Sequence, residues 1–194
     1  MMDKIDLENS YFHGLAGGIP FWDRDRIIAT GLEQLRSIVR CKGIYSRRIL
    51  KENFGIEYKD KEPEYNGDDY ISVCLKNFDD SELYQNGLLL DSSFFRYVRY
   101  KIGIALEPDI VNRYQFRKDK YNKLPGERQI LNGVKISDFQ AIVIGVEQRE
   151  KIIPKIYKIF ENTNIPITDT DGNIICDIEQ NIRYTENKEK ECLN

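Results

Sequence analysis

The sequence predicts an α+β protein with a single domain. Two stretches, residues 23–40 and 152–160, carry apolar residues at helical spacing. About six short stretches are rich in β-branched residues or alternate apolar with polar residues, and they are concentrated in the second half of the chain. Helices and strands therefore do not alternate as in a repeating βαβ fold. The chain has 194 residues, enough for one domain with a sizeable core.

A long amphipathic helix is predicted after the first strand. The strand covers residues 11–15 and ends at the break Gly17-Gly18-Ile19-Pro20. The helix begins after Asp23, a suitable N-cap, and runs to about Arg40, because its apolar residues recur every three or four positions. Gly43 is expected to end this helix.

The other strands are predicted from β-branched runs or from alternation. They are residues 69–75, 102–106, 127–131 and 141–146, and a hairpin of residues 165–169 and 173–178 that turns at Asp171-Gly172. Residues 50–68 are expected to form a long loop, and residues 113–125 an irregular segment on the substrate side. We expect a turn at Asn132-Gly133, a helical turn at residues 136–139, and Pro154 near the first turn of the second helix.

The composition is that of an ordinary globular protein, with 41% hydrophobic and 31% charged residues. Lys and Arg total 29 against 32 Asp and Glu, and a net charge of -3 gives no global field that attracts nucleic acid or an anionic membrane. No apolar run is long enough to span a membrane, and no signal-peptide pattern opens the chain. We expect a cytoplasmic protein, or one exported without a cleaved signal peptide. Residues 1–184 are assigned to the domain and residues 185–194 to a frayed polar tail.

The sequence favours no metal site. The four cysteines form no C-x-x-C pair, and a single histidine argues against a His-based zinc site. Residues 168–173 resemble half an EF-hand loop, but Ile167 and Ile178 would occupy its first and twelfth positions, where calcium needs oxygen ligands. The glycines near residue 14 match neither G-x-G-x-x-G nor a P-loop.

The only histidine marks the candidate site. It stands in Tyr11-Phe12-His13-Gly14-Leu15, ahead of the predicted helix. Three further pieces follow in order: Lys42-Gly43-Ile44-Tyr45-Ser46-Arg47-Arg48, Asp69-Tyr70-Ile71-Ser72 and Gly126-Glu127-Arg128-Gln129. This order resembles the ADP-ribosyltransferase superfamily, in which a His-Gly strand, a helix, a strand with Tyr or Ser and a late strand opened by Glu succeed one another. The resemblance implies a split two-sheet core that grips NAD between the sheets.

The resemblance also implies which residues hold NAD. His13 would hydrogen-bond the adenosine ribose, and Gly14 would let the backbone approach the cofactor. Arg47 or Arg48 would hold the diphosphate through the planar donor fork of arginine. A structural histidine and solvent-facing loop arginines are the competing interpretations.

Two tyrosines compete for the wall of the nicotinamide site, where a flat aromatic face suits the bound ring. Tyr70 and Ser72 are preferred, because a strand after a long loop fits the second position of the motif. Tyr45, in a Gly-Ile-Tyr sequence similar to that of poly-ADP-ribose polymerases, is the alternative.

Glu127 is the predicted catalytic residue, together with His13. In the family, a glutamate that opens a late strand accepts a hydrogen bond from the 2′-hydroxyl of the nicotinamide ribose and stabilises the oxocarbenium-like state. This chain has Glu127-Arg128-Gln129 where arginine-modifying toxins have Gln/Glu-x-Glu, so arginine is a less favoured acceptor. A solvated charge at a strand end is the competing interpretation.

The implied function is NAD-dependent mono-ADP-ribosyl transfer by a toxin, effector or phage-defence enzyme, with NAD as substrate and no metal. The charge balance favours a protein acceptor over nucleic acid, and no membrane partner is expected. An RNA 2′-phosphotransferase of the same fold ranks lower, because that family uses more basic residues and usually a second histidine. A non-catalytic protein-binding module is the alternative from another class, in which His13 and Glu127 are structural.

Overall fold

One large sheet organises the part of the chain that the structure, a computed structural model, describes: residues 4–16, 19–20, 22–57, 69–75, 101–118, 127–146 and 149–176. Its strands are β1 (Tyr11–Gly14), β3 (Tyr70–Leu75), β4 (Ile102–Leu106), β5 (Phe116–Lys118), β6 (Glu127–Leu131), β8 (Phe139–Ile144), β9 (Ile167–Thr168) and β10 (Ile174–Cys176). They lie in the order β10-β9-β8-β4-β1-β3-β6-β5. Only β8 and β9 are parallel among these neighbours. A second, two-stranded ladder pairs β2 (Gly43–Tyr45) with β7 (Gly133–Lys135).

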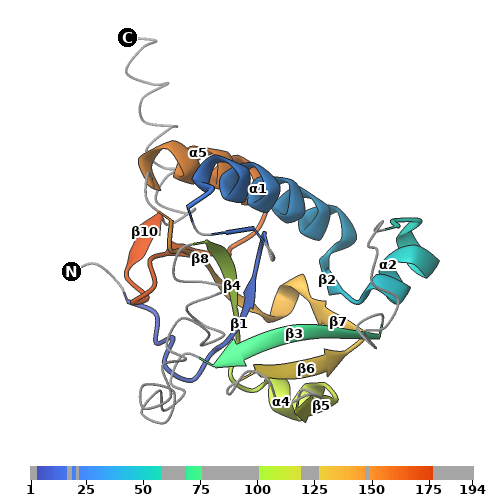
Figure 1. The fold of residues 1–194 in the computed structure, drawn as a ribbon. Coiled ribbons are helices and arrows are strands. Elements are labelled where there is room, and N and C mark those ends of the chain that lie inside the picture. The colour runs from blue at the N-terminus through green and yellow to red at the C-terminus, as the bar shows by residue number, and fades with distance from the viewer. Residues whose placement is uncertain are drawn as a thin grey trace.

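Two long helices cover one face of the large sheet. Figure 1 shows α1 (Arg24–Cys41) and α5 (Arg149–Phe160) side by side above β4 and β8. Their apolar stripes, which include Leu35 and Ile156, are buried against Ile104 and Ile142 in the main core. Each such aliphatic side chain contributes about 1.5–3 kcal/mol by leaving water. The predicted mixed α and β class, with a single domain and an amphipathic helix after the first strand, is confirmed at this level.

A smaller apolar cluster lies on the other face. Phe12, Cys74, Ala105 and Val143 come from four neighbouring strands and are buried together with Leu7 of the N-terminal segment. Residues that alternate with them along the strands, such as Ile104, belong to the main core. Both faces of the central strands are therefore covered.

The end of α1 differs from the prediction. Lys42, not Gly43, adopts the left-handed conformation that closes the helix (φ 58°), and its N–H bonds the carbonyls of Ile38 and Val39. Gly43 is instead the first residue of β2. A Cβ added there would lie 2.4 Å from the carbonyl oxygen of Val134 on β7. The glycine therefore serves the close approach of two strands rather than a helix cap.

A helix stands where the sequence predicts the start of a long loop. Residues 50–54 belong to α2 (Arg47–Phe54), so the prediction is wrong there. Ser46 caps its start by accepting a hydrogen bond from Ile49 N–H at 3.4 Å, and Gly55 closes its end at φ 65°. Only Leu50 of this helix is buried, which explains why apolar periodicity does not reveal it. Residues 58–68 of the predicted loop lie outside the described residues.

Two predictions in the second half need correction. The segment 113–125 is not irregular at its start, since α4 (Ile110–Arg113) ends there and β5 follows. Residues 119–125 lie outside the described part. Pro154 stands inside α5, which begins at Arg149, rather than near its first turn.

The remaining predicted elements occur. The strands at 69–75, 102–106, 127–131 and 141–146 appear as β3, β4, β6 and β8, and the helical turn appears as the 3-10 turn η4 (Ile136–Asp138). The predicted hairpin is β9–β10, with Gly172 at φ 86° in its turn. Residues 177–194, including the predicted tail, lie outside the described residues. None of the described helices has the length and apolar character required to cross a membrane.

The contact at Gly43 gives a stability prediction. Gly43→Ala is expected to lower the free energy of unfolding by about 2–3 kcal/mol, because backbone of β7 blocks the methyl group. Gly55→Ala is a suitable control, since no atom lies within 4 Å of the point that its Cβ would occupy and only the left-handed conformation resists alanine, at about 1 kcal/mol. Urea denaturation of both variants measures the difference. Equal losses would contradict the assigned role of Gly43.

Candidate functional site

A cavity of about 400 Å³ lies where α1, β1, β2 and α2 meet. Four of the residues predicted for NAD binding line it: His13 and Gly14 from β1, Tyr45 from β2 and Arg47 from α2. Apolar side chains of α1, β2, α2 and β3 form much of the remaining wall. The cavity thus has the mixed character of small-molecule sites, mainly apolar with a few convergent polar groups.

His13 is held by the neighbouring strand. Its Nδ1 lies 2.9 Å from the carbonyl oxygen of Ser72 on β3. Because a carbonyl only accepts hydrogen bonds, Nδ1 carries the proton and donates it. Burial lowers the pKa of His13, and the Ser72 hydrogen bond opposes this with a smaller effect. The ring is therefore neutral at pH 7, with Nε2 as a hydrogen-bond acceptor.

Tyr45 reaches the cavity through the small β-ladder. Its backbone pairs with Gly133 of β7. Its ring stacks on Phe54 of α2, with ring centroids 5.6 Å apart and planes 25° apart. Burial raises the pKa of Tyr45, so its hydroxyl stays protonated at neutral pH. An aromatic side chain on the wall of the cavity is thus held by a strand on one side and a helix on the other.

Neither Tyr70 nor Ser72 lines the cavity. The guanidinium of Arg117 stacks on the ring of Tyr70, 3.4 Å from its centroid, and Tyr70 is not part of the cavity wall. Ser72 contacts His13 through its backbone carbonyl. Of the two tyrosines that the sequence leaves open, the structure brings Tyr45 to the histidine.

Arg47 and Arg48, the two arginines predicted to hold the diphosphate, make different contacts. Arg48 donates to Asp69, to Glu52 at 3.2 Å and to the side-chain oxygen of Asn132 at 2.8 Å. Hydrogen bonding to Asp69 is the main reason that the pKa of Arg48 is raised. Arg48 thereby ties α2 to the start of β3 and to the turn after β6, whereas Arg47 lines the cavity.

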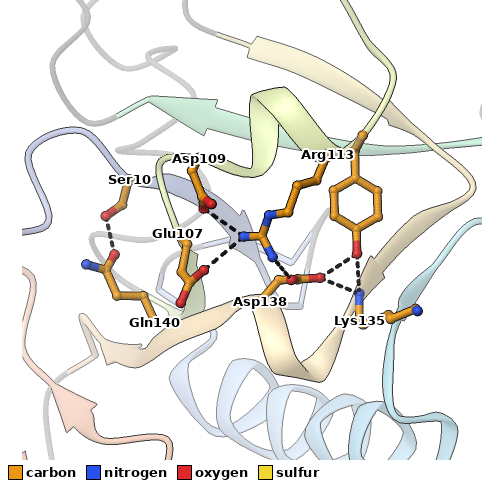
Figure 2. A network of polar contacts seen from close by, with 8 residues as sticks. Ser10, Glu107, Asp109, Arg113, Lys135, Asp138 and Gln140 are labelled. Carbon is orange, nitrogen blue, oxygen red and sulfur yellow. Dashed lines mark hydrogen bonds and ion pairs between the residues drawn. The ribbon is translucent and has the colours of Figure 1, made fainter.

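A buried carboxylate holds the other side of the small ladder. Asp138 of η4 accepts hydrogen bonds from Arg113 and from the backbone N–H of Lys135, as Figure 2 shows. It also accepts a hydrogen bond from the hydroxyl of Tyr114. Arg113 also donates to Glu107 at 2.8 Å and to Asp109 at 2.7 Å. These contacts fix α4 against the end of β7. They therefore position β7, the strand that pairs with β2 and thus with Tyr45.

Glu127 opens β6 as predicted, and its backbone pairs with Cys74 of β3. Cys74 in turn pairs with Phe12 of β1, so the strands that carry Glu127, Ser72 and His13 are neighbours. Phe12 and Cys74, which are in register with Glu127, pack into the smaller apolar cluster, and neither of them lines the cavity. The side chain of Glu127 lies outside the described part of the structure.

Two further wall residues were not nominated from the sequence. Gln34 and Ser37 stand one helical turn apart on α1 and line the cavity. The side-chain oxygen of Gln34 accepts from the N–H of Ala16 at 2.6 Å, and Lys101 donates to the carbonyl of Ala16 at 3.0 Å. Ala16 itself is left-handed, with φ 55°. Both ends of this strained residue, just after Gly14, are therefore held by side chains.

Among the described residues, no group of three or more His, Cys, Asp or Glu side chains is arranged to hold a metal ion. Neither a protein-family model nor a curated protein matches this chain. The functional conclusion therefore depends on the geometry of the site itself.

The lowered pKa of His13 predicts a pH dependence of stability. The unfolded chain binds a proton near pH 6.5, whereas the folded protein resists it, so this contribution is complete above about pH 6.5 and is lost as the pH falls below it. The difference in unfolding free energy between wild type and His13→Gln should be larger at pH 7.5 than at pH 5.5. Urea denaturation at both values measures it. A difference that grows toward acidic pH would contradict the assigned neutral state.

Proposed function

We propose that this protein is an NAD-dependent mono-ADP-ribosyltransferase, acting as a toxin, an effector or a defence enzyme. One observation supports the proposal most directly. The three strands singled out by the resemblance, β1, β3 and β6, are far apart in the sequence yet are consecutive neighbours in the sheet. The cavity that holds both His13 and Tyr45 adds to this support. We assign the sheets to a split ADP-ribosyltransferase-like core on this basis.

The proposed reaction breaks the bond between C1′ of the ribose and the nicotinamide nitrogen. The electron pair leaves with nicotinamide, and the acceptor nucleophile forms a bond to C1′ and loses its proton to water. Glu127 is the group proposed to accept a hydrogen bond from the 2′-hydroxyl and to stabilise the positive charge on the ribose. The role of Glu127 rests on its position at the start of β6.

The cavity residues are proposed to bind NAD. Neutral His13 offers Nε2 as an acceptor for a ribose hydroxyl. The flat ring of Tyr45 packs on an aromatic ring of the ligand, and Arg47 contributes a positive charge to the same cavity. A protein acceptor is favoured, because the net charge of -3 provides no broad positive footprint for nucleic acid.

One observation favours a non-catalytic binding module as the second candidate. The backbone of Glu127 is in register with Cys74 and Phe12 across the sheet. Neither Cys74 nor Phe12 lines the His13 cavity, the cavity of about 400 Å³ whose wall includes His13. In such a module, His13 would serve the packing of β1 against β3. Activity measurements separate the two candidates.

Nicotinamide release from NAD tests the proposed reaction. Wild-type protein with a lysate as the source of acceptors is expected to release nicotinamide. Glu127→Gln should lower the rate about a hundredfold or more, because the amide carries no charge to stabilise the transition state. His13→Ala should lower it through weaker NAD binding. Circular dichroism of each variant checks its folding.

Glu52→Gln is a matched control for Glu127→Gln, since Glu52 pairs with Arg48 outside the cavity. Its rate should remain near that of wild type. If wild type releases no nicotinamide with any acceptor source and NAD does not raise its melting temperature, the binding module is the better description.

The two tyrosines give a second functional prediction. Tyr45→Ala should raise the Kd for NAD about tenfold, because the ligand loses a stacking surface in the cavity. Tyr70→Ala should leave the Kd nearly unchanged, because Arg117 covers that ring away from the cavity. Isothermal titration calorimetry of both variants measures the effect. The reverse order would support the tyrosine preferred from sequence.

A further inference from the structure

A second cavity, a groove of about 500 Å³, adjoins the first one along α1. The two cavities share Gln34 and Ser37, so these residues form a common wall. The side-chain oxygen of Gln34 is occupied by Ala16 N–H, which leaves its amide N–H groups as donors. A ligand that extends out of the His13 cavity over this wall enters the groove directly.

Two arginines line the groove. Arg36 and Arg40 are four residues apart on α1, so both project to the same side of the helix, with Cβ atoms about 5–6 Å apart. Within the described residues, neither side chain forms an ion pair or a hydrogen bond. Both residues are exposed, and an arginine side chain of this kind can bind an anion through its planar donor fork.

Two carboxylates line the groove beside the two arginines, so the charges of neighbouring residues also matter. These are Glu33 and Glu57, and Glu57 is paired with Lys51 at 3.0 Å. Arg47 in the adjoining cavity adds a further positive charge. The described residues that line the two cavities therefore carry one more positive than negative charge, whereas the whole chain has a net charge of -3.

We propose that the α1 groove is an anion-binding extension of the His13 cavity, in which Arg36 and Arg40 hold the diphosphate of a dinucleotide. The identity of the dinucleotide as NAD rests on the proposed function. Arg48, the other arginine nominated from the sequence, is engaged with Asp69 and Glu52 and lines neither cavity. The ligand thus spans both cavities, with a nucleoside beside His13 and its phosphates on α1.

Calorimetric titration with three probes tests this inference: NAD, ADP-ribose and nicotinamide riboside, which lacks phosphate. The double variant Arg36→Gln/Arg40→Gln should raise the Kd for NAD and for ADP-ribose about tenfold or more. Its Kd for both should also depend less on salt concentration. Binding of nicotinamide riboside should not change. Arg26→Gln/Lys155→Gln removes the same charge from exposed positions of the two covering helices and is the matched control.

The outcomes separate this inference from the proposed function. Binding of ADP-ribose that depends on Arg36 and Arg40, without nicotinamide release by wild type, would retain the anion site and reject the transferase. Equal Kd values for the double variant and the control would overturn the anion site, and so would a wild-type protein that binds neither diphosphate. Circular dichroism establishes that each variant is folded before titration.

Discussion

The pairing of β1 with strands on both sides is the constraint on which the rest of the site depends. Phe12 pairs with Ala105 of β4 and with Cys74 of β3 and is almost completely buried in the smaller apolar cluster. Because side chains alternate along a strand, His13 must then face the helices and the cavity. A shift by one residue would exchange the two side chains and bury the imidazole in an apolar cluster. Burial of Phe12 thus fixes the position of His13, and α1 closes over the same face.

The elements with strong periodicity are those that the sequence predicts. β4 is buried at all five positions, and the buried stripe of α1 runs from Ile27 to Cys41, so both patterns are visible locally. α2 lacks such a pattern, since its stability depends on the caps at Ser46 and Gly55 and on the contacts of Arg48. The role of Gly43 depends on Val134, which is distant in the sequence. Contacts of this kind exist only in the folded chain.

The site residues, too, depend on contacts between distant parts of the sequence that local patterns do not reveal. His13 is conspicuous because it is the only histidine, but Tyr45 and Tyr70 each fit a local motif. Tyr45 lines the cavity through the pairing of β2 with β7, a contact between segments far apart in the sequence that no local pattern near Tyr45 indicates. Arg47 and Arg48 are adjacent on a helix, where successive side chains point about 100° apart, so only one faces the cavity. Which of the two arginines faces the cavity depends on the orientation of α2 against the sheet, which the sequence alone does not give.

The distribution of charge is compatible with the proposed binding of a small anion by a chain with a net charge of -3. Screening limits the reach of an exposed charge to about 8 Å at physiological ionic strength. The electrostatic potential in the cavity is therefore set by nearby charged residues rather than by the net charge of the chain. Several of the acidic residues near the site are engaged in holding the scaffold: Asp69 and Glu52 on Arg48, and Glu107, Asp109 and Asp138 on Arg113. The arginines of the α1 groove have no such partner among the described residues. The few arginines of the two cavities match the size of the proposed diphosphate but are too few for the extended contacts that a polynucleotide requires, so the proposed transferase would act on a protein rather than on nucleic acid.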